Sequence, residues 1–321
     1  MKISGFTFVR NAGKLYYPVK ESIMSILPIV DEFVVALGDN DPDDTTEKEI
    51  LSINSPKIKI VRTVWDIEKY PRGTENAHQT DIAKEHCSGD WLFYLQADEV
   101  VHEQDLDFIK SMCEKYLDDK RVDGFLFKYY HFWGDFDHVI ESHGWTPYEI
   151  RIIRNDPDIH SYISAQSFRR IPGFDGKDYR TKKNVSKLNV VMLDAYIYHY
   201  GWARPPRVMQ TKRKALDTIH FGKKRTEETY QRRDPVFDYG NLSKLKKFTG
   251  THPAVMKDWI SRFDWADQLH YEKDYKPTRE PVKHEMLKSK VLTWIEKTFF
   301  GMPNRFGIIN WNKIITYEKK N

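Results

Sequence analysis

Two adjacent carboxylates follow an apolar run in the stretch FYLQADEVVHE, residues 93–103. The run has the pattern of a buried strand, and Asp98 and Glu99 come where an unpaired charge would be costly to bury. Such a carboxylate is stable when it accepts hydrogen bonds or binds a cation, and hard divalent ions prefer oxygen ligands. The residues therefore predict a cation site at Asp98. Alternatively, Asp98 or Glu99 caps a helix over 104–117. For Glu99, capping or a supporting role is at least as favoured as binding the cation.

Alternating strands and helices position these carboxylates. The apolar patterns predict strands over 3–9, 32–38, 57–65 and 91–95, with helices over 14–30, from Thr45 or Thr46 through Leu51, and over 76–87. This alternation predicts a parallel sheet covered by helices. Further strands are predicted over 124–133, 148–155 and 190–202, and their directions are left open.

Polar residues follow three of the predicted strands. Arg10 and Asn11 come after the first strand, Asp39 after the second, and Asp98 after the fourth. Ligands of open α/β sheets bind beyond the carboxyl ends of the strands, where the loops converge. We therefore expect these side chains to share one rim.

Charge and composition exclude several classes of protein. The 321 residues are 40% hydrophobic and carry a net charge of +4, which makes no case for nucleic-acid binding. Residues 201–250 hold thirteen bases against five acids, which suits an anionic ligand or, equally, a solvated basic face. Cys87 and Cys113 fall at apolar positions of predicted helices and fit a reducing cytoplasm. No apolar stretch has the length of a signal peptide or a spanning helix.

Five motifs in order together resemble one family: VRN (9–11), PDDT (42–45), GTENAHQTDIA (73–83), LQADE (95–99) and GWTPYEIRIIR (144–154). The chain is similar over residues 1–202 to glycosyltransferase family 2 of the GT-A fold, and within it to bacterial lipopolysaccharide and polysaccharide glycosyltransferases. The resemblance implies an α/β GT-A nucleotide-diphospho-sugar transferase fold, with a mostly parallel central sheet flanked by helices. It places a catalytic domain at 1–203, and a helical, basic and aromatic-rich extension follows at 204–321.

The implied activity is inverting transfer of a sugar from a nucleoside diphosphate to an acceptor hydroxyl, with Mn or Mg as the divalent metal. The implied acceptor is a glycan or glycolipid of the bacterial envelope, and the implied location is the cytoplasm, at the inner membrane face. The C-terminal segment 291–311 is aromatic and basic enough to contact a membrane surface, although packing against the main domain is the favoured interpretation.

The resemblance also assigns site residues. Asp98 becomes the metal ligand, Gln96 replaces the first Asp of the family's D-x-D motif, and His199 resembles a late His that completes the metal or diphosphate site. The residues expected to bind the nucleotide-sugar are Arg10, Asn11, Asp39, Asn76, Gln96, Arg204 and Arg207. Either Asp39 or Asp41 is expected to contact the nucleotide base. Lys212 and Arg213 are further candidates for binding the diphosphate.

The general base is the weakest part of the assignment. Gln166 stands where the related branch often carries an acid, and an amide cannot accept the proton. Glu149 is favoured because it lies in the motif that should line the acceptor side, with Asp135 and Asp137 as the remaining acids; Glu149 paired with an arginine is the structural alternative. The expected acceptor platform is aromatic and consists of Trp133 and Trp145, although core packing explains most aromatic residues.

Two other functions stay open. A nucleotidyltransferase would also use a strand-end Asp and a metal, but FVRNAGK (8–14) is poor in the glycine that a phosphate loop needs. A non-catalytic nucleotide-sugar-binding protein would keep the scaffold and lose the chemistry, and Gln96 and Gln166 favour it.

Overall fold

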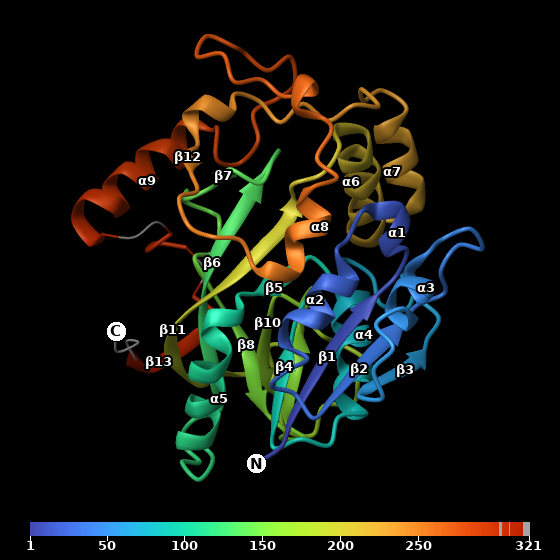
Figure 1. Ribbon diagram of the computed structural model, residues 1–321, viewed down its shortest axis with the longest axis vertical. Helices are drawn as coiled ribbons and strands as arrows, with labels where there is room; N and C mark the ends of the chain where they lie inside the picture. The colour runs from blue at the N-terminus through green and yellow to red at the C-terminus, as the bar shows by residue number, and fades with distance from the viewer. Residues whose placement is uncertain (302–303, 308, 317–321) are drawn as a thin grey trace.

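Three strand–helix–strand units build the first part of the sheet (Figure 1). The computed structural model describes residues 1–301, 304–307 and 309–316. The chain runs in turn through β1 (Ile3–Val9), α1 (Ala12–Leu15), α2 (Val19–Ile26), β2 (Glu32–Leu37), α3 (Thr46–Leu51), β3 (Ile58–Arg62), α4 (Thr74–Glu85) and β4 (Trp91–Tyr94). The strands lie in the order β3-β2-β1-β4 and are all parallel, which confirms the alternation predicted for this part of the chain.

The second part of the sheet is mixed. Its elements are β5 (Glu99–Val101), α5 (Leu106–Lys115), β6 (Gly124–Trp133), β7 (His138–Val139), β8 (Tyr148–Arg154), β9 (Ile159–Tyr162), β10 (Ser167–Arg170) and β11 (Ser186–Trp202). Strand β8 runs antiparallel to both β4 and β6, β11 is parallel to β6, and β5 and β10 run antiparallel to β11. The prediction of a mostly parallel sheet is therefore wrong. No helix lies between β6 and β11 in the chain, and strands joined without a crossover helix can pair antiparallel.

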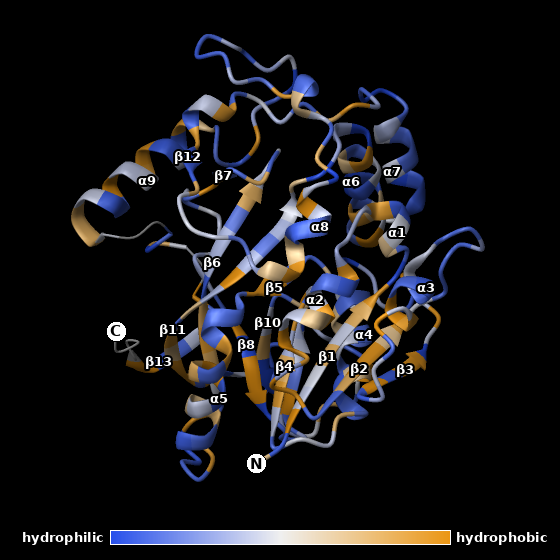
Figure 2. Cartoon of the chain, in the orientation of Figure 1, coloured by the Kyte–Doolittle hydropathy of each residue, from blue (hydrophilic) through white to orange (hydrophobic). Residues whose placement is uncertain are grey.

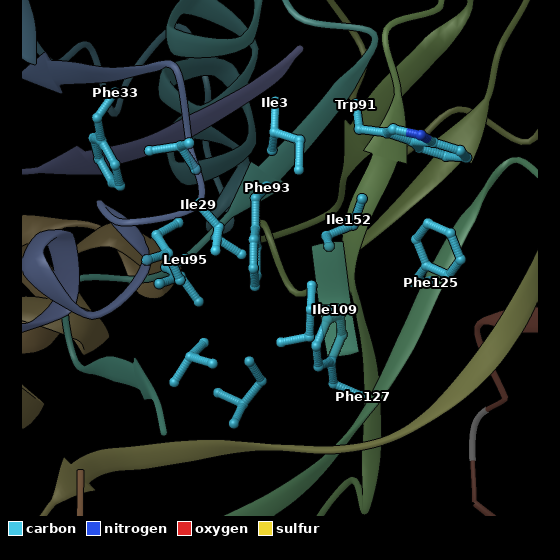
Figure 3. Packing of buried hydrophobic residues seen from close by; sticks show 14 of the residues in the cluster. Ile3, Ile29, Phe33, Trp91, Phe93, Leu95, Ile109, Phe125, Phe127 and Ile152 are labelled. Carbon is cyan, nitrogen blue, oxygen red and sulfur yellow. The ribbon is translucent and has the colours of Figure 1, made fainter. Parts of the chain in front are cut away.

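Successive residues of β4 fill two separate cores, because side chains alternate across a strand. Trp91 and Phe93 point to the side covered by α2 and α5, where Ile109 and Ile152 pack against them (Figure 3). The side chains between them, Leu92 and Tyr94, are buried on the side of α4. Burial on both faces explains why this strand is a continuous apolar run rather than an alternating one.

The C-terminal region extends the molecule beyond the ends of β6 and β11. Its elements are α6 (Pro206–Phe221), α7 (Lys223–Tyr230), β12 (Lys246–Lys247), α8 (Lys257–Ile260), α9 (Leu287–Phe300) and β13 (Trp311–Thr316). Strand β13 pairs in parallel with β11, so the region contributes to the sheet as well as providing helices. Trp133 and Tyr200 from the first 203 residues share one buried cluster with Phe237, Trp259 and Trp265.

Hydropathy follows this architecture. Figure 2 shows hydrophobic residues gathered along β2, β3 and β8, while α7 is mostly hydrophilic. Within the described part of the chain, we find no helix that combines the length and the apolar character needed to span a membrane.

Candidate active site

Asp98 lies in the turn between β4 and β5, at the carboxyl edge of the parallel strands, and is only 4% exposed. Its Oδ2 accepts a hydrogen bond from Nζ of Lys212 at 2.9 Å, and Nη2 of Arg204 lies 3.8 Å away. Burial alone would raise the pKa of Asp98, but the positive charge of Lys212, its hydrogen bond and the charge of Arg204 outweigh burial and hold the pKa well below its usual range. The carboxylate is therefore ionised at every physiological pH.

Lys212 reaches this carboxylate from the second turn of α6. Its Nζ also donates to the carbonyl oxygen of Gly201 at 2.7 Å, and the side chain is 5% exposed. Burial lowers the pKa of Lys212 to about 8, the nearby Arg204 acts in the same direction, and Asp98 opposes them. The site thus contains a lysine whose charge responds to small changes around it.

The second feature next to Asp98 is a pair of histidines, held by adjacent strands β6 and β11 in which His131 and His199 are register partners. Nε2 of His131 lies 2.7 Å from the carbonyl oxygen of Thr146, and its Nδ1 lies 2.9 Å from Nδ1 of His199. A carbonyl only accepts, so His131 carries its hydrogen on Nε2. Burial lowers the pKa of His131 to about 3, which leaves its Nδ1 bare, so His199 must donate from Nδ1.

This arrangement fixes the other face of His199. Burial also lowers the pKa of His199, so the neutral ring presents an unprotonated Nε2, which lies 3.7 Å from Oδ1 of Asp98. Two electron-pair donors therefore face the same spot. Gly201 borders that spot: a Cβ added there would lie 2.4 Å from Nε2 of His199 and 2.9 Å from Oδ2 of Asp98. Any larger residue would fill the space between them.

Glu99 has a different environment from its neighbour. It forms a bidentate ion pair with Arg151 of β8, with both N···O distances at 2.7 Å, and accepts from the Tyr129 hydroxyl at 2.8 Å. The backbone N–H of Gln96 completes the set at 3.0 Å. Glu99 is therefore a supporting residue, and neither carboxylate caps the following helix; the 3₁₀ turn at 103–105 is capped by His102.

A large pocket of about 1460 Å³ opens beside the histidine pair. Gln96, His131 and His199 line this pocket, and so do the predicted acceptor residues Trp133 and Trp145. The two indoles meet edge to face at 5.7 Å between ring centroids. Trp133 is 1% exposed and its Nε1 donates to the carbonyl oxygen of Tyr239, so it supports the wall, whereas Trp145 is only partly buried.

Glu149 also lines the large pocket. It is 6% exposed, and its Oε2 has no hydrogen-bond partner among the described residues. Burial raises the pKa of Glu149 to about 8, and the charge of Arg151 only partly opposes this. A carboxyl group with that pKa can exchange a proton near neutral pH, as a general base must. Gln166, where the related branch carries an acid, lies at the same pocket but is exposed.

A smaller rim pocket of about 320 Å³ lies at the carboxyl ends of β2 and β3, and Asp39 and Asp41 both line it. Arg10 donates to Asp39 at 3.2 Å, and Oδ1 of Asn11 accepts from the backbone N–H of Asp41 at 2.7 Å. Lys14 pairs with Asp41 at 2.8 Å. The structure thus brings the residues after β1 and β2 together, with each carboxylate already held by one cation.

Other predicted site residues lie elsewhere. Asp135 is 3% exposed and accepts hydrogen bonds from the backbone N–H and the ring of His138 and from the hydroxyl of Tyr271. Neither Asp135 nor the exposed Asp137 lines either of the two pockets. Asn76 is buried in α4, and its Oδ1 has no hydrogen-bond partner among the residues that the structure describes; Arg207 is exposed on α6, and neither residue lines either of the two pockets. The structure does not bring these four residues to the Asp98 site.

Arg204 is fully buried. One of its nitrogens donates to the carbonyl oxygen of Leu15, while Nε and Nη2 have no hydrogen-bond partner among the described residues. Two donors of a buried guanidinium that make no hydrogen bond to the described residues suit the oxygens of a phosphate.

The donor atoms at Asp98 partly fit a divalent cation. Oδ1 of Asp98 and Nε2 of His199 lie 3.7 Å apart, close enough to bind one ion, and His and Asp are both ligands of Mn and Zn. The described residues contain no group of three or more His, Cys, Asp or Glu side chains arranged for a metal. A cation bound here would therefore take its other ligands from a substrate and from water.

Comparisons with known proteins give partial likenesses only. No protein-family model and no curated protein matches the chain. Among solved structures, S. aureus TarS 1–349 aligns over 68% of this chain and 65% of that chain, with 14% sequence identity and a TM-score of 0.39. The complex of TarS 1–349 with UDP-GlcNAc gives 16% identity, coverages of 68% and 66%, and a TM-score of 0.37.

A second structural neighbour is glucosyl-3-phosphoglycerate synthase from Mycobacterium tuberculosis, in complex with Mn2+, UDP and phosphoglyceric acid. It aligns over 40% of this chain and 43% of that chain, with 18% identity and a TM-score of 0.27. The chain therefore spans less than two thirds of TarS 1–349 and less than half of the synthase. With TM-scores below 0.5, these likenesses assign neither a fold family nor an activity to the chain.

Proposed function

We propose that the chain is an inverting glycosyltransferase of the GT-A type, which moves a sugar from a nucleoside diphosphate to an acceptor hydroxyl with the help of a divalent metal. The observation that carries the proposal is the pair of unprotonated donor atoms on Asp98 and His199, 3.7 Å apart at the carboxyl edge of the parallel strands. Buried cations stand next to it, and a large pocket with an unpartnered acid opens beside it.

The residues divide the reaction between them. Asp98 and His199 would hold the metal, which neutralises charge on a departing diphosphate. Lys212 and Arg204 would share that task as fixed cations. Glu149 would take the proton of the acceptor hydroxyl while the acceptor oxygen bonds to the anomeric carbon and the bond to the diphosphate breaks. Residues around the rim pocket, Asp39 or Asp41 with Arg10 and Asn11, would bind the nucleoside.

The substrate of the large pocket would be the acceptor. A volume of about 1460 Å³ exceeds that of a single sugar unit and suits a glycan or glycolipid. Arg213 lines this pocket, packs its guanidinium 4.9 Å from the ring centroid of Phe237, and has no ion pair with any described residue. An acidic group on the acceptor would supply an ion-pair partner for Arg213. We extend the proposal to acceptors of the bacterial envelope.

Substitution of Asp98 by Asn tests the metal site directly. We expect Asp98→Asn to weaken binding of Mn2+ together with a UDP- or GDP-sugar by tenfold or more (about 1.4 kcal/mol), because the neutral amide loses the charge that attracts the cation. Titration calorimetry measures this without turnover. Asp118→Asn, an exposed carboxylate outside both pockets, is the matched control. Unchanged metal-dependent binding in Asp98→Asn would remove Asp98 as a ligand.

A non-catalytic nucleotide-sugar-binding protein is the second candidate, and one observation favours it. Lys212 already occupies Oδ2 of Asp98, as expected for a carboxylate with a structural role. Product analysis with UDP- and GDP-sugars, with and without Mn2+, separates the candidates. Release of UDP or GDP supports transfer, release of pyrophosphate supports a nucleotidyltransferase, and binding without turnover supports the binding protein.

A further inference from the structure

Helix α9 buries polar residues against the protein and leaves several of its apolar residues exposed. Ser289 and Glu296 are 6% and 0% exposed, whereas Leu287 and Trp294 are 77% and 64% exposed. Surface helices of globular proteins normally have the reverse arrangement, with the apolar stripe on the core. Figure 1 shows α9 projecting from one flank of the molecule.

The two sides of the helix are separate stripes. Leu287, Val291 and Trp294 recur at i, i+4 and i+7, which places them on one face, and we call them the apolar stripe. Ser289, Thr293 and Glu296 form a second stripe with the same spacing, each residue two positions after a member of the apolar stripe. Because each residue turns the helix by about 100°, this second stripe lies on the opposite side.

Buried hydrogen bonds fix the helix in this orientation. Glu296 accepts from Nδ1 of His143 at 2.9 Å and from the backbone N–H of Asn304 at 2.6 Å, and Oγ1 of Thr293 accepts from the backbone N–H of His143 at 2.8 Å. Rotating α9 to bury the apolar stripe would leave Glu296 without these partners, at a cost that its burial makes large. The exposure of the stripe is therefore built into the fold.

The exposed charges of α9 all have one sign. The helix contains Lys288, Lys290 and Lys297, all exposed, and its single acid is the buried Glu296. Lys297 pairs with Glu141 at 3.2 Å, while Lys288 and Lys290 form no ion pair with any residue that the structure describes. An apolar stripe with lysines on its flanks complements a surface that is apolar inside and anionic outside.

We propose that α9 docks on an anionic lipid bilayer, with the apolar stripe in the interface and Lys288 and Lys290 at the headgroups. Trp294 suits this place because indole rings prefer the boundary between hydrocarbon and water. Phe299, which is 69% exposed, adds apolar area beside Trp294, with 6.5 Å between the ring centroids. A second copy of the chain fits less well, because it would bring two sets of lysines together. The proposal does not depend on the glycosyltransferase assignment.

Cosedimentation of the full chain with lipid vesicles tests the docking. We expect binding to vesicles made of equal parts phosphatidylcholine and phosphatidylglycerol, weaker binding to phosphatidylcholine alone, and a loss of binding in high salt. The double variant Leu287→Ser/Trp294→Ser should lower the partition coefficient by about tenfold or more. Lys288→Gln/Lys290→Gln should lower it by about tenfold on the anionic vesicles only.

Leu51→Ser/Val64→Ser is the matched control, because these side chains are 60% and 76% exposed but lie outside α9. It should bind like the unaltered protein, and all three variants should keep its unfolding midpoint, since each changes exposed positions. Failure of the unaltered protein to bind anionic vesicles overturns the proposal. An equal loss of vesicle binding in the control variant overturns it as well. So does a third outcome, in which light scattering shows that the unaltered protein is a dimer without vesicle binding and that Leu287→Ser/Trp294→Ser converts this dimer to a monomer.

Discussion

Asp98 and Glu99 are neighbours in the chain, yet their charges are neutralised by different partners. Asp98 contacts Lys212, which is 114 positions away, and Glu99 contacts Arg151, which is 52 positions away. The apolar run before them made both carboxylates visible in the sequence. Their partners were not visible as such, because a local pattern carries no information about which distant side chain folds back onto it. Lys212 was considered for a diphosphate and not for Asp98.

For the same reason, the sequence identified only one member of the histidine pair. His199 follows a recognisable strand, but His131 becomes significant only because β6 and β11 pair in parallel with these two residues opposite each other. Strand register over 68 positions is set by tertiary packing. The alternation of Tyr129 and His131 on one face of β6 was the available signal, and it did not indicate a partner.

Glu149 provides a prediction for pH dependence at the scale of one residue. Its pKa is about 8 in the folded protein and near 4.5 when unfolded, so between these values the native state holds a proton that the unfolded chain has lost. The free energy of unfolding should therefore fall as pH rises through this window. In Glu149→Gln the contribution of this residue to the slope should disappear, a difference of about 1.4 kcal/mol per pH unit, measured by urea denaturation at several pH values.

The same substitution tests the chemistry. If Glu149 is the general base, kcat/KM should rise with pH up to about 8, and Glu149→Gln should lower kcat by about 10²–10⁴-fold while leaving donor affinity unchanged. An unaltered kcat would exclude Glu149 as the general base. Gln166→Ala, which changes another pocket residue with no ionisable group, is the control.

At the scale of elements, hydrophobic periodicity identified strands in the later part of the sheet but not their directions. The runs over 124–133 and 148–155 were predicted as strands, and the structure has β6 and β8 there. Periodicity reports which face is buried, and a strand has the same faces whether it runs up or down. The reversal at β8 is what brings Glu149 and Arg151 to the end of β4.

The ion pair between Glu99 and Arg151 joins β8 to the turn after β4. Both side chains are nearly inaccessible, at 1% and 2% exposure. Arg151→Met should lower the free energy of unfolding by about 3–5 kcal/mol, because it leaves Glu99 charged and buried. Chemical denaturation measures the change. Arg121→Met removes an exposed arginine that pairs with Asp119, and it should leave stability unaltered; an equal loss in both variants would contradict the argument.

At the scale of the molecule, a boundary near residue 204 was expected from the change in composition. The structure shows one buried aromatic cluster that contains Trp133, Tyr198 and Tyr200 on one side of that position and Phe237 and Trp265 on the other. Composition could not reveal this, because aromatic residues are common on both sides and only the fold shows which of them meet.

Removal of the C-terminal region tests whether the first 203 residues are independent. Ending the chain there would expose the buried faces of Trp133, Tyr198 and Tyr200, each of which contributes about 2 kcal/mol by burial. We expect the fragment 1–203 to aggregate or to unfold without cooperativity, as judged by circular dichroism during heating. A fragment that unfolds in one sharp transition would show that the two regions are separate domains.

The hydrogen bonds of Glu296 have one more consequence. His143, which they hold, belongs to the loop that carries Thr146, and the carbonyl of Thr146 orients His131 and through it His199. A short relay of contacts thus links the outer helix to the carboxylate of Asp98. If adsorption to a surface shifts α9, the relay gives turnover a dependence on available surface area, and adding vesicles at constant substrate would reveal it as interfacial activation.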